Sequence, residues 1–193
     1  MQYVALGDSI SIDAYTGVVG GGAASQLARR LNADFVDLTR DGNTTDGVVA
    51  DVERVPAEPD VVTLTAGGND LLMGRPVDEI LGNLRRIAER LATFRCPVVM
   101  NTVYDPTDGD DELGRDLLGL PVELRAEFDT LNRGIASIAA EHAFLLADLE
   151  TLFHGHGVAS ADPWYVAVIE PNLAGATAIA ERWHELVRGA ASH

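Results

Sequence analysis

The chain has 193 residues, 47% of them hydrophobic and 23% charged, which predicts one globular domain over residues 1–193 with a single substantial core. The formal net charge of −16 repels phosphate backbones and anionic lipids, so it argues against nucleic-acid and membrane partners. No apolar run approaches the roughly 20 residues that span a bilayer, no secretory signal pattern opens the chain, and the single Cys96 cannot form an internal disulfide; together these features favour a cytoplasmic protein.

The predicted elements alternate between strand and helix along the chain. Short apolar runs, with the composition of strands buried on both faces, occupy residues 2–8, 34–40, 60–67, 97–104 and 143–149. Helices are predicted between and after them at residues 24–31, 46–55, 77–94, 124–138 and 173–187. In the third of these helices, the apolar residues recur on one face, as Ile80, Leu84, Ile87 and Leu91. This alternation predicts an α/β fold, a doubly wound parallel sheet of five strands with right-handed crossovers.

Two connections are longer than such a sheet needs. Residues 107–120 are acidic, and residues 154–171 are rich in glycine, histidine and aromatic side chains, among them Trp164 and Tyr165. Long loops in a compact domain are usually functional. We therefore expect both connections to wall a substrate cleft, with Asp105, Trp164 and Tyr165 as substrate contacts.

Polar residues and glycines follow every predicted strand at its carboxyl end, where open α/β sheets bind their ligands. They are Ser9, Gly42, Asn69, Asp105 and, several residues after the last strand, His154 and His156. Any one of these loops alone is ordinary turn chemistry. Their convergence at one sheet edge favours a functional site.

The chemistry that this set of groups supports is acyl transfer. The Ser9 hydroxyl is a nucleophile that needs a base to remove its proton. The backbone N–H groups of Ser9 and Gly42 and the side-chain amide of Asn69 are three donors for a tetrahedral oxyanion, and each such donor lowers the barrier by roughly 3–4 kcal/mol.

Four short motifs, in this order, resemble the sequence blocks of the SGNH/GDSL hydrolases. They are GDSI at Ser9, GNTT at Gly42, GGND at Asn69 and PNLAG directly after Glu170, so the resemblance extends over nearly the whole chain. It implies a three-layer, flavodoxin-like fold with a five-stranded parallel sheet. It also implies an esterase, lipase, thioesterase or deacetylase that acts on a small-molecule ester without a cofactor, with Ser9 as nucleophile and Ser9, Gly42 and Asn69 as the oxyanion hole.

The last block departs from the family pattern. Where the family usually has D-x-x-H before the Pro-Asn pair, with the histidine as base and the aspartate as its orienting acid, this chain has Ala167, Val168, Ile169 and Glu170. Both members of the usual pair are therefore replaced.

Three interpretations of this departure compete. Glu170 itself takes the serine proton, which requires burial to raise the pKa of its carboxyl group. Alternatively His156 or His154, in the same long loop, fills the vacant position with Glu170 as its acidic partner. In the third interpretation the fold has lost hydrolysis and serves as a ligand-binding or regulatory protein. The intact Ser9, Gly42 and Asn69 set ranks an active hydrolase with an atypical base first and the inactive binder second.

Overall fold

Five short strands form the central sheet of the computed structural model, which describes residues 1–119 and 124–191. The strands are β1 (Gln2–Gly7), β2 (Asp34–Thr39), β3 (Val61–Thr65), β4 (Val98–Asn101) and β5 (Leu145–Ala147). They lie in the order β2-β1-β3-β4-β5, and every neighbouring pair is parallel. The predicted fold class, an α/β protein with a five-stranded parallel sheet, is confirmed.

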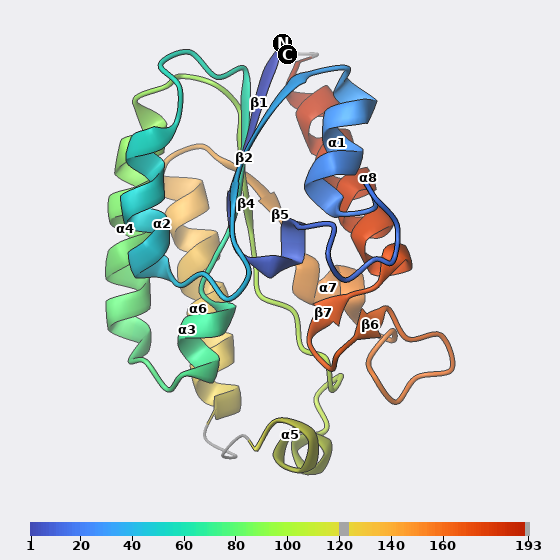
Figure 1. Ribbon diagram of the computed structural model, residues 1–193. Helices are drawn as coiled ribbons and strands as arrows, with labels where there is room; N and C mark the ends of the chain where they lie inside the picture. Colours follow the sequence, from blue (N-terminus) through green and yellow to red (C-terminus); the bar gives the residue numbers. More distant parts are fainter. Residues whose placement is uncertain (120–123, 192–193) are drawn as a thin grey trace.

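Helices cover both faces of this sheet (Figure 1). One face packs against α2 (Thr45–Asp51), α4 (Val77–Ala92) and α6 (Leu124–Glu141), and the other against α1 (Ala23–Leu31) and α8 (Leu173–Ala190). Side chains alternate along each strand, so Val4 and Leu6 join the first layer while Tyr3 and Ala5 join the second. The predicted apolar faces therefore fill two cores, one on each side of the sheet.

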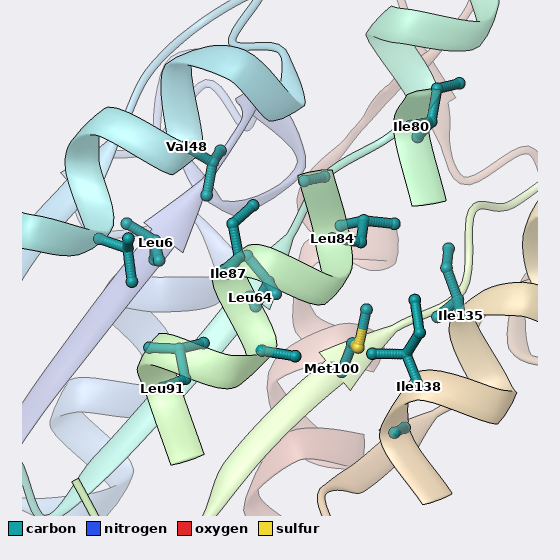
Figure 2. Packing of buried hydrophobic residues seen from close by; sticks show 14 of the residues in the cluster. Leu6, Val48, Leu64, Ile80, Leu84, Ile87, Leu91, Met100, Ile135 and Ile138 are labelled. Atoms are coloured by element: carbon teal, nitrogen blue, oxygen red, sulfur yellow. The ribbon is translucent and has the colours of Figure 1, made fainter. Parts of the chain in front are cut away.

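The core under α4 shows how helical periodicity produces this packing. Ile80, Leu84, Ile87 and Leu91 are all buried, and they belong to the same cluster as Leu6, Leu64 and Met100 of the sheet (Figure 2). Val48 of α2 and Ile135 and Ile138 of α6 complete the layer. The positions are those that the sequence pattern assigned to one helix face.

Several short elements lie outside the predicted set. They are the 3₁₀ turn Ser9–Ser11, the helices α3 (Gly68–Leu72), α5 (Asp111–Leu118) and α7 (Leu149–Phe153), and the hairpin strands β6 (Tyr165–Val166) and β7 (Glu170–Pro171), whereas the 3₁₀ turn Val52–Arg54 continues α2 inside the helix predicted at residues 46–55. Each is too short for a periodic pattern to reveal it. The acidic connection 107–120 contains α5, whose first turn is capped by the Asp110 carboxylate. Residue 120, the last of this connection, is outside the described part of the chain.

The carboxyl ends of the strands share one edge of the sheet, and α3, α5 and the β6–β7 hairpin lie beyond that edge (Figure 1). The chain reverses its direction of progress across the sheet at β1, which lies between β2 and β3. Such a reversal opens a crevice in α/β sheets. Among the described residues, no helix combines the length and apolar character needed to cross a membrane.

Candidate active site

Ser9 begins the 3₁₀ turn that follows β1, so its N–H is one of the first amides of a helical turn and has no partner within it. The Ile10 N–H donates to the Asp8 carboxylate over 3.3 Å, which caps the turn. The preceding Gly7 has φ = 138°, and a side chain there would collide with the Thr65 carbonyl group. The Ser9 side chain is thereby held at the sheet edge with 5% of the residue exposed.

Glu170 accepts the hydrogen bond of the Ser9 hydroxyl. The distance from Ser9 Oγ to Glu170 Oε1 is 3.0 Å, and 7% of Glu170 is exposed. Burial raises the pKa of this carboxyl group to about 7; repulsion from the Asp8 and Asp41 carboxylates adds to the increase, and the Ser9 hydrogen bond opposes it. Within the described residues, the second carboxylate oxygen, Oε2, is buried and has no hydrogen-bond partner.

The β6–β7 hairpin presents Glu170 to Ser9. Val166 pairs with Glu170 across the hairpin, and the turn between them contains two residues with positive φ, Ala167 at 49° and Val168 at 73°. A β-branched residue in this left-handed region is a genuine outlier. The hydroxyl of Tyr104, in the segment after β4, donates to the Ile169 carbonyl oxygen over 2.6 Å and fixes the backbone next to Glu170.

Hydrogen bonds join the loops that contain the candidate oxyanion donors. The Asn69 side-chain amide donates to the Asn43 carbonyl oxygen over 2.9 Å and has a second N–H to offer. The Asn43 amide in turn donates to the Gly7 carbonyl oxygen over 3.1 Å. Gly42 precedes Asn43 in a turn with φ = 65°, and its Cα faces open space. The loops after β1, β2 and β3 therefore form one bonded unit around Ser9.

A second hydrogen-bond network, centred on Asp70 and Asp51, holds the same loops in place. Asp70 is buried and accepts from the Thr45 N–H over 2.8 Å and from the Thr45 hydroxyl over 2.7 Å. Asp51, also buried, accepts from the Arg40 guanidinium over 2.6 Å and from the Asn43 amide over 3.2 Å. These bonds satisfy buried polar groups that would otherwise be costly.

A cavity of about 110 Å³ opens beside Ser9 and Glu170. Asn69 and Asp105 also line it, whereas Gly42 does not. Its apolar walls are formed by α3, α6 and the segments after β4 and β6, through Leu71, Leu72, Val103, Leu124, Phe128 and Ile169. The site thus combines a hydroxyl, a buried carboxylate and an apolar chamber.

The two predicted histidines lie away from the Ser9 hydroxyl. The His154 side chain is 78% exposed, with its Nδ1 3.7 Å from the Asp108 carboxylate. The His156 ring stacks on Trp164 with a centroid separation of 3.6 Å, and its Nδ1 lies 3.0 Å from the Asp162 carbonyl oxygen. In the part of the chain that the structure describes, neither ring is hydrogen-bonded to Ser9.

Of the three predicted substrate contacts, Asp105 lines the cavity, whereas Trp164 and Tyr165 are not among its lining residues. Asp105 lines the cavity, but its carboxylate is occupied by the Thr107 and Gly109 N–H groups and by Arg125 at 2.9 Å. Burial raises the pKa of Asp105, and these hydrogen bonds outweigh burial, so the pKa is lowered overall. Trp164 lies on a separate shallow depression beside α8. Tyr165 packs edge-on against Tyr104 with centroids 5.2 Å apart and is not among the cavity-lining residues.

Tyr104 is the residue that sequence reasoning missed. It lies three residues after the end of β4, at the carboxyl edge where ligands bind, and this position was the available signal. Its hydrogen bond to Ile169 spans 65 residues, so no local pattern predicts it.

The profile of the GDSL-like lipase/acylhydrolase family matches residues 5–178. The chain belongs to that family. A lipase of Streptomyces rimosus is 27% identical to it over 88% of this chain and 78% of the relative. The predicted family is thereby confirmed, and these relatives support the hydrolysis of acyl esters as its class of reaction.

Solved structures with the same fold are more distant in sequence. A member of the lipolytic G-D-S-L family from Veillonella parvula has a TM-score of 0.77 at 21% identity, over 97% of this chain and 98% of that one. An acetylxylan esterase of Geobacillus stearothermophilus has a TM-score of 0.76 at 18% identity, over 96% and 93% of the two chains. At these identities the likeness concerns the fold.

Proposed function

We propose that this GDSL-family member is a serine-dependent acyl-ester hydrolase in which Glu170 is the general base for Ser9. The observation that carries the proposal is the 3.0 Å hydrogen bond from the Ser9 hydroxyl to a buried carboxylate whose pKa is about 7. A base is most effective when its pKa is near the working pH. An exposed glutamate would be too weak a base, and burial corrects this weakness.

The reaction would run in two steps. Ser9 Oγ attacks the ester carbonyl while Glu170 takes the hydroxyl proton, and the protonated Glu170 then gives this proton to the departing alcohol. Water next attacks the acyl-serine, with Glu170 as base again, and the acid leaves as Ser9 recovers its proton. The carbonyl oxygen becomes an oxyanion in both steps, and the N–H groups of Ser9, Gly42 and Asn69 are the proposed donors to it.

The orientation of the base has an unusual origin in this proposal. In a Ser-His-Asp triad, an acidic side chain orients the base. Here the described residues offer no such partner, because Glu170 Oε2 has no hydrogen bond. The Val166–Glu170 pairing and the Tyr104–Ile169 hydrogen bond are the contacts that hold Glu170 in place.

Hydrolysis of p-nitrophenyl butyrate by variants tests the assignment. We expect Ser9→Ala to lose nearly all turnover and Glu170→Gln to lose about 10²- to 10⁴-fold in kcat. His154→Ala and His156→Ala serve as matched controls and should stay close to the wild type. Equal rates for the wild type and Ser9→Ala would refute serine-dependent hydrolysis and leave the binder interpretation in its place.

The pH dependence separates a carboxylate base from an imidazole base. The active form is the Glu170 carboxylate, so kcat/KM should rise with pH and reach half its plateau near pH 7, the pKa of Glu170. Ionisation of a carboxyl group absorbs almost no heat, whereas loss of a proton from imidazolium absorbs much. The pH midpoint of kcat/KM should therefore be the same at roughly 10 °C and roughly 35 °C, both of which lie below the usual unfolding temperatures of such domains. A midpoint that falls on warming would favour a histidine.

A further inference from the structure

The cavity beside Ser9 has the shape of an acyl-chain chamber, an interpretation that rests on the proposed hydrolysis. It leads from Ser9 and Glu170 between α3 and α6 and reaches α5. Leu71, Leu124, Phe128 and Ile169 give it apolar walls, and Asp110, Asp111 and Arg125 also line it next to α5. An apolar tail attached to a carbonyl at Ser9 would leave water on entering such a chamber.

Helix α5 closes the chamber through a residue that has no side chain. Gly114 is buried and lines the cavity, while Arg115, Asp116 and Leu117 on the same helix are exposed. Among the described residues, a methyl group on Gly114 would meet the Thr107 methyl group at 3.9 Å, which is an ordinary van der Waals contact. The backbone at Gly114 is helical, so no unusual φ requires glycine there.

Glycine at this position therefore needs another reason. In a helix interior, glycine is less favourable than alanine, and the space around Gly114 would accept a larger side chain. Because Gly114 lines the chamber, a larger side chain there would reduce the space beside Thr107.

We propose that Gly114 determines the length of acyl chain that the protein accepts, by leaving room for a tail of about four carbons beyond the carbonyl. An apolar cavity of about 150 Å³ holds benzene, and this chamber measures about 110 Å³. Butyryl to hexanoyl esters fit that space, and longer straight chains do not.

Ion pairs fix the position of the α5 roof. Arg125, in the first turn of α6, donates to Asp111 at the start of α5 and to Asp105 after β4, each over 2.9 Å. The Asp110 carboxylate caps the same helix end by accepting from the Glu112 and Leu113 N–H groups over 3.0 Å. These contacts hold the first turn of α5 beside the cavity.

A series of p-nitrophenyl esters from acetate to decanoate tests the proposal. For the wild type, kcat/KM should rise about fourfold per added methylene until the chamber is full and should then fall for octanoate and decanoate. Gly114→Ala should lower the hexanoate-to-acetate ratio of kcat/KM about fourfold, and Gly114→Leu about tenfold or more. A wild-type rate that keeps rising to decanoate, or an unchanged ratio in folded Gly114→Leu, would overturn it.

Gly82 provides the matched control. It lies inside α4, nothing lies within 4 Å of the place its side chain would occupy, and it does not line the chamber. Gly82→Ala makes the same helix substitution, so the ester profile should stay that of the wild type. A ratio that changes as much in Gly82→Ala as in Gly114→Ala would count against a local effect of Gly114.

A binding measurement keeps this inference separate from the hydrolase proposal. Ser9→Ala protein should bind hexanamide more tightly than acetamide in ligand-observed NMR, and adding Gly114→Leu should remove this preference. If Ser9→Ala hydrolyses esters as fast as the wild type, the proposed function fails, and the amide preference still decides the role of Gly114. If hexanamide gains nothing over acetamide, the chamber proposal fails even when hydrolysis depends on Ser9.

Discussion

The two sides of the candidate site are held in opposite ways. On the side of Ser9 and Asn69, buried polar groups such as Asp70 and Asn43 have hydrogen-bond partners. On the side of Glu170, the turn contains two non-glycine residues with positive φ, and one carboxylate oxygen is buried without a partner in the part of the chain that the structure describes. Satisfied buried groups stabilise a fold, whereas unsatisfied groups and strained backbone cost stability and occur at functional sites. Removing a satisfied group should therefore lower stability, whereas removing an unsatisfied group or a strained residue should raise stability or leave it unchanged.

Glu170→Gln should have the largest effect, a loss of activity together with a gain in stability at high pH. The folded protein holds the pKa of Glu170 at about 7, above its ordinary value of 4.5. The folded state therefore binds the proton more tightly than the unfolded state, and the resulting stability is present below pH 4.5 and lost as the pH rises through 7. Glutamine does not titrate, so the variant avoids this loss.

Urea unfolding at two pH values measures the difference. Between pH 5 and pH 8, the free energy of unfolding of Glu170→Gln relative to the wild type should increase by about 2.5 kcal/mol. Comparing the two pH values cancels the cost of a buried amide, which is present at both. A difference that does not change with pH would mean that Glu170 titrates in the folded protein as it does in the unfolded chain.

Asp70→Asn tests the satisfied side. Asparagine keeps the size of the side chain, but its NH₂ group must face a Thr45 donor or the Arg75 guanidinium, which lies 3.4 Å from Asp70. We expect the free energy of unfolding to fall by about 2–3 kcal/mol. Asp46→Asn is the control, since Asp46 pairs with the same Arg75 but is exposed, and it should lower the free energy of unfolding much less than Asp70→Asn does. Similar losses of unfolding free energy in both variants would show that the burial of Asp70 does not increase its contribution to stability.

Two neighbouring tyrosines, Tyr104 and Tyr165, differ in whether the hydroxyl group has a hydrogen-bond partner among the described residues. Tyr104→Phe keeps the ring stacked on Phe153 but removes the donor to the Ile169 carbonyl group. We expect stability to fall by about 1–2 kcal/mol and kcat by about tenfold, because Glu170 is held less firmly. Tyr165→Phe removes a hydroxyl that is buried without a partner among the described residues, so neither quantity should fall. The pH–rate midpoint should shift only in Tyr104→Phe, and an unshifted midpoint would limit Tyr104 to a structural role.

The sequence predicted the satisfied side better than the strained side. The strands and long helices follow from apolar runs and from the period of Ile80, Leu84, Ile87 and Leu91, and Ser9 and Asn69 follow from their place after β1 and β3. The partner of the Ser9 hydroxyl, Glu170, lies 161 residues away in a hairpin whose strands have two residues each. Ala167 and Val168 carry no turn signal, so that hairpin has no local pattern. His156 remained an open alternative because its stacking on Trp164 is a tertiary contact.

Val168→Gly should have the smallest effect on the free energy of unfolding, and it tests directly whether the backbone at Val168 is strained. At φ = 73° the β-branched side chain is strained, whereas glycine adopts this conformation freely. The relief should exceed the entropy that glycine loses on folding and raise the free energy of unfolding by about 1 kcal/mol. Val166→Gly, two residues earlier in β6 and also in the hairpin, has no positive φ to relieve and should lower it by about 0.5–1 kcal/mol. Opposite signs in urea unfolding would locate the strain in the turn that places Glu170 beside Ser9, and equal losses would mean that Val168 adopts its conformation without cost.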